Sequence, residues 1–244
     1  TTNKFSLLWA KHKIQNAHNI CNAYSIRNFA EFFEGRIVII MCPGPSLVLD
    51  LHKVKLNRRK YVIMAPAQSC MILSEFGITP DFICVIDPSD LSGTLADVNM
   101  AKVTGAILYD TCHPNIFQAC SETNLIVLGD KSTVYNSGAL IEHPAFDFTG
   151  MGVLITMFKI ARGYEATTIG LMGVDLSLSS GEYSGDYVNI NSGSLPDNID
   201  RENNEDSDVF WSKASGRYHK KIYVESNCGK KIFQRIRRQK IICT

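Results

Sequence analysis

Residues 36–50 constrain the fold of this chain more than any other stretch. An unbroken apolar run from Ile37 to Met41 is followed at once by turn-forming residues at 42–46 and then by a helix-compatible segment. A short run that is apolar at every position is typical of a strand buried on both faces, as in a parallel sheet. The sequence therefore predicts a first strand at 36–41, inside a sheet that is covered on both sides.

The loop after this strand, Cys42-Pro43-Gly44-Pro45-Ser46, predicts a place where an anion binds. Its prolines and glycine turn the chain sharply, and Ser46 can then cap the helix that follows. Gly44 lets a phosphate or ribose approach the backbone closely. Backbone N–H groups converge on an anion where a strand, a tight loop and a helix N-terminus meet.

Strands and helices alternate along the rest of the core. Further apolar runs predict strands at 61–65, 82–86, 106–109, 125–128 and 168–172, and the segments between them predict helices at 46–56, 68–76, 114–119 and 150–161. Gly77 stands where a C-cap glycine is expected. Fully apolar strands separated by helices predict an α/β fold, a Rossmann-like and mostly parallel sheet with helices on both faces.

The segment before the core, 6–34, has a helical pattern. Its apolar residues recur at spacings of three and four, which predicts a helical lead-in packed against the sheet through Ala10, Ile14, Ala17, Cys21 and Tyr24.

Beyond the last predicted core strand the composition changes. Residues 179–208 are rich in Ser, Gly, Asn and Asp, which is typical of a lid or binding loop, and a strand at 218–224 and a basic helix at 230–238 follow. We therefore expect one domain over 1–244, divided into a lead-in (1–35), a nucleotide-binding core (36–178), a lid loop (179–208) and a C-terminal strand and helix (209–244).

The balance of charge argues against some function classes. Lys and Arg together number 25 and Asp and Glu 24, so the net charge of +1 gives no excess for binding nucleic acid.

The apolar runs are much shorter than the roughly 20 residues of a transmembrane helix. No basic, then apolar, leader opens the sequence. We expect a cytoplasmic protein without a transmembrane segment.

The eight cysteines form no Cys-x-x-Cys pair and no zinc-like spacing. Cys42 and Cys84 lie at or in apolar strands, where a free thiol packs as a small hydrophobe, so we expect a reduced protein. Cys42 also precedes a helix N-terminus, a position that can lower the pKa of a thiol. No partner base is apparent, and we expect no catalytic thiol.

Three predicted strands end in unusual loops: residues 42–46, Asp87-Pro88-Ser89 and Gly173-Val174-Asp175. Ligands of open parallel sheets bind beyond the carboxyl ends of the strands, although such residues also suit ordinary turns. Neither Gly-x-Gly-x-x-Gly nor a Walker Gly-Lys-Ser/Thr follows the first strand. Their absence argues against NAD and against ATP held in a P-loop.

An ordered set of motifs resembles one family. The motifs are Gly44-Pro45-Ser46-Leu47, Gly77-Ile78-Thr79-Pro80-Asp81-Phe82, Val85-Ile86-Asp87-Pro88, Gly150-Met151-Gly152 and Met172-Gly173-Val174-Asp175-Leu176. Together they resemble the motility-associated factor (Maf) glycosyltransferases, which are grouped with the MptE-like proteins. They are also distantly similar to bacterial sialyltransferases that use CMP-sialic acid.

The resemblance implies transfer of a nonulosonic acid (sialic, pseudaminic or legionaminic type) from a CMP-activated donor to a glycan or to flagellin. It implies no cofactor beyond that donor and no metal. Tyr183 and Tyr187 match tyrosines that bind the leaving phosphate in the sialyltransferases, where phenol hydroxyls stabilise its charge. The residues it places at the nucleotide are Gly44, Pro45, Ser46, Gln68, Asp87, Pro88, Ser89, Gly150, Met151, Gly152 and Asp175.

The acceptor hydroxyl needs a base whose pKa lies near the working pH, and histidine is the natural choice. We expect His219, shortly after the polar loop, to be this base; the alternative is a surface residue beside two lysines. His113, at the end of the fourth strand, is the second candidate. The acidic residues between 197 and 208 lack the spacing of an EF-hand and are expected to be a solvated lid.

Two alternatives stay open. MptE-like archaeal proteins are pterin diphosphokinases that use ATP and magnesium, which would require an acidic metal site; Asp87 and Asp90 are the candidates for it. The other alternative is a non-catalytic nucleotide-binding module. Many Maf proteins are longer than this chain, so we expect acceptor recognition to be reduced here or supplied by a partner. The sequence does not indicate the oligomeric state.

Overall fold

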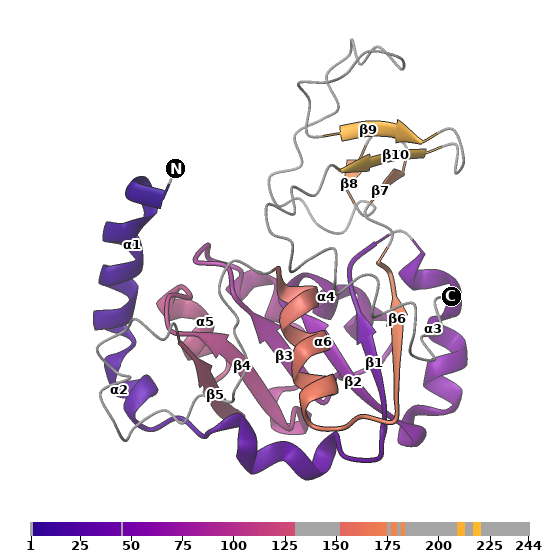
Figure 1. Cartoon of the computed structure of the whole chain (residues 1–244), viewed down its shortest axis with the longest axis horizontal. Coiled ribbons are helices and arrows are strands. Elements are labelled where there is room, and N and C mark those ends of the chain that lie inside the picture. The colour runs from indigo at the N-terminus through magenta and orange to yellow at the C-terminus, as the bar shows by residue number, and fades with distance from the viewer. Residues whose placement is uncertain are drawn as a thin grey trace.

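The computed structural model describes residues 2–44, 46–129, 152–174, 177–179, 182–183, 209–212 and 217–220. Side chains are described for residues 6–44, 46–48, 51–129 and 152–174. At the centre lies a six-stranded sheet in the order β5-β4-β3-β2-β1-β6, and every neighbouring pair of strands is parallel (Figure 1).

The strands form where the apolar runs predict them. Every residue of β3 is buried, and so is every residue of β1 after Ile37, as expected for strands covered on both faces. The strands are β1 (Ile37–Met41), β2 (Tyr61–Pro66), β3 (Phe82–Val85), β4 (Gly105–Tyr109), β5 (Asn124–Leu128) and β6 (Thr168–Met172). The predicted α/β, Rossmann-like parallel sheet is confirmed.

Helices alternate with these strands. They are α3 (Leu47–Leu56), α4 (Ala67–Glu75), α5 (Pro114–Ala119) and α6 (Val153–Gly163), with short 3₁₀ helices η2 (Arg58–Lys60), η3 (Ser92–Leu95) and η4 (Met100–Lys102). Helix α4 ends as predicted, because Gly77 adopts φ +66° and the N–H of Ile78 donates to the Leu73 carbonyl at 2.8 Å. The predicted cap of α3 is wrong: Ser46 precedes the helix, but its side chain makes no capping hydrogen bond.

The two faces of the sheet bury separate apolar clusters. Ile39 and Met41 of β1 pack with α3, α4 and α5 on one face, whereas Val38 and Ile40 pack with α6 and with residues 26–33 of the lead-in on the other. This division follows from the order of the strands. Right-handed crossovers from β1 to β5 all run in one direction across the sheet, and the return to β6 runs in the other, so α6 lies on the opposite face.

The lead-in is helical, but its predicted packing face is wrong. It consists of α1 (Thr2–Gln15), α2 (Ala17–Cys21) and the 3₁₀ helix η1 (Ile26–Phe32). Ile14 is 75% exposed and Tyr24 is 52% exposed, whereas His12, Asn16 and Ile20 are buried. The buried face is partly polar because His12 and Asn16 bond to backbone carbonyls of another loop.

A second, four-stranded antiparallel sheet has the order β8-β7-β10-β9. Its strands are β7 (Ser177–Ser179), β8 (Glu182–Tyr183), β9 (Val209–Ser212) and β10 (Arg217–Lys220). The expectation of a wholly structureless 179–208 loop is therefore wrong at its start, and β9 was not predicted. The predicted helix at 230–238 lies outside the described residues. Figure 1 shows the small sheet beyond the carboxyl ends of β1 and β6.

A backbone contact joins β1 to β6 at their carboxyl ends. The N–H of Cys42 donates to the Met172 carbonyl, and the N–H of Gly44 donates to the Gly173 carbonyl, both at 2.8 Å. Gly173 has φ +64°, and a Cβ atom at this position would overlap the carbonyl oxygen of Cys42. Only glycine permits this approach without a backbone shift.

We expect the Gly173→Ala variant to lower the free energy of unfolding by about 2–4 kcal/mol. Alanine at this position would have a strained left-handed backbone, and its Cβ would also overlap the carbonyl oxygen of Cys42. Gly35→Ala is the matched control: Gly35 has φ +67° but open space around its Cβ position. It should cost about 1–2 kcal/mol, from strain alone. Urea unfolding followed by circular dichroism measures both, and equal losses would contradict the proposed overlap.

Candidate functional site

The candidate site lies along the carboxyl edge of the large sheet. Gly44, Gln68 and Asp87 follow β1, β2 and β3, which are neighbours in the sheet. The order of the strands reverses between β1 and β6, and ligands of open α/β sheets bind at such a switch point. The fold thus brings these three predicted residues to one edge. Pro45, Asp175, Gly150, Met151 and Tyr187, which were also predicted, lie outside the described residues.

Helix α6 directs its N-terminus to the same edge. Its other end is tied to the amino edge, because the N–H of Gly35 donates to the Glu165 carbonyl at 3.1 Å and that of Thr167 to the Arg36 carbonyl at 2.9 Å. Gly152 precedes the first turn and is exposed. The amide groups of this first turn carry a partial positive charge, which suits an anion.

The loop after β3 holds its acidic residues in fixed positions. Asp87 is exposed, and its Oδ1 accepts a hydrogen bond from the N–H of Ser89 at 2.7 Å. Asp90 Oδ1 accepts from the hydroxyl of Ser92 at 2.6 Å, and its Oδ2 accepts from the Asn115 amide at 2.6 Å. These donors, the Ser92 hydroxyl first, hold the pKa of Asp90 below its ordinary value. Asp90 is therefore a carboxylate at neutral pH, with donors already on both oxygens.

His113 lies next to Asp90, at the start of α5. Its Nδ1 accepts a hydrogen bond from the N–H of Asn115 at 3.2 Å and lies 3.7 Å from Asp90 Oδ2. The neutral ring that accepts this bond carries its proton on Nε2. His113 is part-exposed and contacts the ring of His12 edge-on, with 5.1 Å between the ring centroids.

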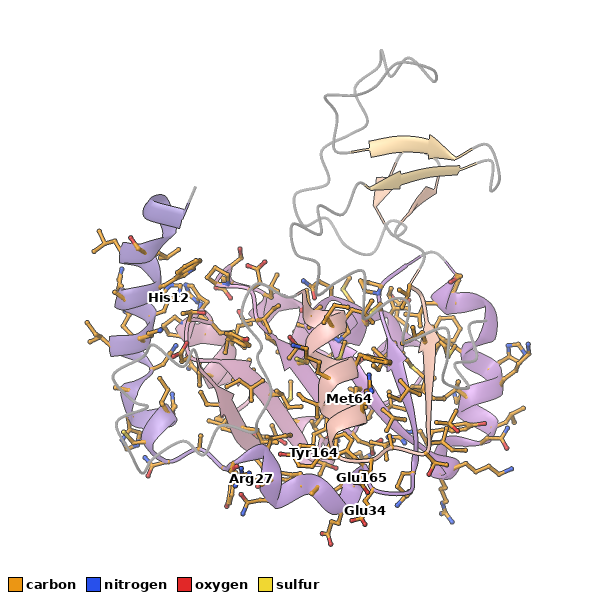
Figure 2. The ribbon with its side chains drawn as sticks, in the orientation of Figure 1. His12, Arg27, Glu34, Met64, Tyr164 and Glu165 are labelled. Carbon is orange, nitrogen blue, oxygen red and sulfur yellow. The ribbon has the colours of Figure 1, made fainter. Side chains whose placement is uncertain are left out.

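His12 lies beside these residues, and the sequence pattern did not indicate it as part of a site. Figure 2 shows His12 on α1. It is only 3% exposed, and its Nδ1 lies 3.0 Å from the carbonyl oxygen of Thr111, so that nitrogen is the donor. One turn later, the Asn16 amide donates to the carbonyls of Asp110 at 3.3 Å and Cys112 at 2.8 Å. These contacts span more than ninety residues of sequence, so helical periodicity could not indicate them.

Gln68 lies in the first turn of α4 and is half-buried. Its neighbour Ser69 is fully buried, and the Ser69 hydroxyl has no hydrogen-bond partner among the described residues. A buried hydroxyl without a partner is uncommon, and here it occurs one residue from a predicted nucleotide-binding position.

Cys42 precedes a helix, as predicted, but this position does not lower the pKa of its thiol. The side chain is 8% exposed, and burial raises the pKa of its thiol to about 12. The desolvation of a thiolate at this site therefore outweighs any effect of the nearby helix N-terminus. Six cysteines of the described part of the chain are free thiols, and five of these are buried.

Tyr183 and His219 both lie in the small sheet, where the backbone is described. Tyr183 pairs with Leu178, which pairs with Tyr218, the residue before His219. The backbone register thus brings the strands that carry these two residues into one sheet.

No group of three or more His, Cys, Asp or Glu residues in the described part of the chain is arranged to hold a metal ion. Across the same residues, no helix has both the length and the apolar character needed to cross a bilayer.

The sequence matches the model of one family, described as "6-hydroxymethylpterin diphosphokinase MptE-like", over residues 11–181. The match covers well over half of the chain. The chain belongs to the MptE-like family. The resemblance inferred from the motifs is thereby confirmed at the level of the family.

Among solved structures, this MptE-like chain is similar to a structure described as that of the MAf glycosyltransferase from Magnetospirillum magneticum AMB-1. The two share 22% sequence identity with a TM-score of 0.49, over 60% of this chain and 24% of the other. The chain thus spans about a quarter of the length of that protein. No curated protein shows significant similarity to the chain.

We expect Asn16→Ala to lower the free energy of unfolding by about 1–3 kcal/mol, because two buried carbonyls lose their donor. Asn22→Ala is the matched control, since the Asn22 amide donates to the His18 carbonyl in an exposed position. It should change stability by no more than about 0.5 kcal/mol. Urea unfolding curves compare the two, and equal effects would show that Asn16 does not anchor α1.

Proposed function

We propose that this protein is a glycosyltransferase that takes a nonulosonic acid from a CMP-activated donor and transfers it to a hydroxyl of a glycan or of flagellin. The observation that carries the proposal is the gathering of the predicted loops after β1, β2 and β3, with Gly152 before α6, at the switch point of a parallel sheet. The motifs that include Gly44 and Asp87 lie in the loops after β1 and β3. Membership of the MptE-like family supports the proposal.

The described residues offer the kind of groups that the donor needs. The first-turn amides of α6 and the backbone around Gly44 can receive the phosphate, whose charge grows as CMP leaves. Asp87-Pro88-Ser89, after β3, is proposed to contact the nucleotide, with its backbone fixed by the hydrogen bond between Ser89 and Asp87. In this proposal the donor is the only nucleotide required, and no cofactor or metal takes part.

The acceptor hydroxyl must lose its proton as it attacks the sugar. We propose His219 as the base that receives it, and Tyr183 and Tyr187 as groups that stabilise the leaving phosphate. His113 is the alternative base. The reaction is proposed to take place in the cytoplasm.

The family description favours a second candidate, pyrophosphate transfer from ATP to a hydroxymethyl-dihydropterin with magnesium. That reaction needs carboxylates free to approach a cation. Both oxygens of Asp90 already accept hydrogen bonds from Ser92 and Asn115. Among the described residues, only one oxygen of Asp87 accepts a hydrogen bond, so Asp87 and Asp90 together offer a cation one carboxylate oxygen without a donor, which does not favour a two-carboxylate metal site.

Cytidine nucleotides should stabilise the protein more than GDP, UDP or ATP. At a CMP concentration of 100 times Kd, stabilisation of about 2.7 kcal/mol is expected, or about 5–10 °C in Tm for a chain of this size. Differential scanning fluorimetry measures the shift. Asp87→Ala should reduce it, whereas Asp97→Ala, an exposed residue of the same β3–β4 connection, should not.

The nucleotide panel also separates the candidates. A shift that needs both ATP and magnesium, with none from CMP or CDP, would replace the proposed activity with the diphosphokinase. Stabilisation by CMP with no turnover of any CMP-sugar would instead indicate a non-catalytic nucleotide-binding module.

His219→Ala should lower kcat by roughly 10²–10⁴-fold, since a general base contributes about that much. The assay is CMP release from CMP-sialic, CMP-pseudaminic and CMP-legionaminic acid with a glycan or flagellin acceptor. The Kd for CMP should stay unchanged. A loss confined to His113→Ala would assign the base to His113 instead.

A further inference from the structure

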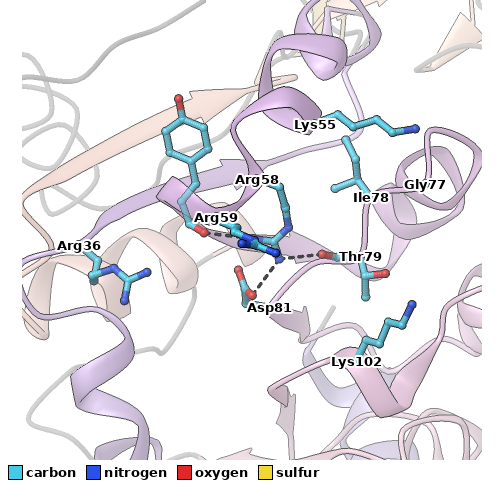
Figure 3. Close-up of a pocket in the computed structure, with 10 residues that line it drawn as sticks. Arg36, Lys55, Arg58, Arg59, Gly77, Ile78, Thr79, Asp81 and Lys102 are labelled. Atoms are coloured by element: carbon cyan, nitrogen blue, oxygen red, sulfur yellow. Dashed lines mark hydrogen bonds and ion pairs between the residues drawn. The ribbon is translucent and has the colours of Figure 1, made fainter.

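A polar cavity lies at the amino edge of the large sheet, opposite the candidate site. It has a volume of about 540 Å³ and is open to solvent (Figure 3). The segments that lead into β1, β2, β3 and β4 contribute its lining. Parallel strands bring their amino ends to one edge, so residues as far apart in sequence as Arg36 and Lys102 line the same cavity.

The lining is strongly basic. It contains five cationic side chains, Arg36, Lys55, Arg58, Arg59 and Lys102, and a single carboxylate, that of Asp81. The net charge of the whole chain is only +1. The excess of cations in the cavity lining is therefore a local feature that the charge balance of the whole chain does not share.

The single carboxylate is already neutralised by one of the five cations. Asp81 Oδ1 accepts from Arg58 Nη2 at 2.8 Å, and its Oδ2 accepts from the N–H of Ile63 at 2.7 Å. The same guanidinium donates to the carbonyls of Thr79 at 2.9 Å and Tyr61 at 3.1 Å. Arg58 and Asp81 thus hold the floor of the cavity in place (Figure 3).

The other four cations are available to a ligand. Arg36, Lys55, Arg59 and Lys102 are exposed, and in the described part of the chain none of them makes an ion pair. Lys55 lies over Gly77, with its Nζ 3.3 Å from where a Cβ of Gly77 would be. Figure 3 shows Lys55 and Lys102 on one side of Asp81 and Arg36 on the other. Like charges that line one cavity repel one another, and a bound anion between them would offset this repulsion.

We propose that this cavity binds a small phosphate-bearing anion with two or more negative charges. The cavity volume lies in the range of roughly 300–1,000 Å³ that is usual for small-molecule sites. Its cations come from the three separate segments that lead into β1, β2 and β4, and they surround a hollow, which suits a compact ligand better than an extended nucleic acid or a flat membrane. Arginine and lysine are the side chains that recognise phosphate.

The proposed anion site is separate from the candidate nucleotide site. The two lie at opposite edges of one parallel sheet, and β1 alone, with five residues, spans about 16 Å between them. The proposal therefore does not depend on the glycosyltransferase activity.

The test uses inorganic pyrophosphate, with binding followed by isothermal titration calorimetry at low and moderate salt. The wild-type protein should bind pyrophosphate saturably, and more weakly as salt screens the charges. A variant carrying Lys55→Gln, Arg59→Gln and Lys102→Gln should lose roughly tenfold or more in affinity. These side chains are exposed and make no described hydrogen bonds, so the variant should keep the thermal stability of the wild type.

Lys60→Gln is the matched control, because Lys60 is exposed in the same 3₁₀ helix as Arg59 but does not line the cavity. It should leave the affinity for pyrophosphate unchanged, and an equal loss in this variant would overturn the proposal. The triple variant should also keep the response of the wild type to CMP. Binding of the wild type to phosphatidylserine vesicles, without saturable binding of pyrophosphate, would assign the cations to a membrane surface instead.

Discussion

The pairing of β6 with β1 is the contact on which the rest of the molecule depends. The chain moves across the sheet from β1 to β5 and must then return past all of these strands to pair with β1. The return puts α6 on the second face of the sheet and so completes the burial of strands that are apolar on both sides. It also brings the carboxyl ends of β1 and β6 together, where Gly173 allows the two backbones to bond without a side chain between them. The same contact therefore closes the core and forms the switch point at which a ligand is expected.

An all-parallel sheet has two edges with different electrostatics. At the carboxyl edge, α6 presents the positive end of its dipole together with the fixed carboxylates of the β3 loop. At the amino edge, helices end, and cations there can stabilise the negative ends of helix dipoles. That effect accounts for Lys55, which lies in the last turn of α3. It does not account for Arg36, which directly precedes a strand, so the basic cavity is more than a set of helix caps.

The sequence predicted the sheet well because each strand carries its own signal, a short run that is apolar throughout. It predicted the lead-in poorly because the face of α1 that packs is decided by distant partners. His12 and Asn16 are buried by hydrogen bonds to the loop after β4, and a polar residue gives no sign of such a partner in its own neighbourhood. The pKa of Cys42 shows the same limit, since the sequence indicates the nearby helix but not the burial that decides it. At the candidate site, the loops were predictable and the contacts among Asp90, His113 and His12 were not.

These contacts also bear on which histidine is the base. The Nδ1 atom of His113 has two neighbours. To accept a hydrogen bond from the N–H of Asn115, at 3.2 Å, Nδ1 must be unprotonated, whereas to donate one to Asp90 Oδ2, at 3.7 Å, it would have to carry a proton. The shorter contact is a hydrogen bond and the longer one is not. The neutral ring therefore holds its proton on Nε2, which makes that nitrogen a donor. To accept a proton from an acceptor hydroxyl through Nε2, His113 would first have to give up the Asn115 bond and turn its Nδ1 proton to Asp90. The observed arrangement suits a hydrogen-bond donor better than a base, which adds a physical reason for proposing the base elsewhere, at His219.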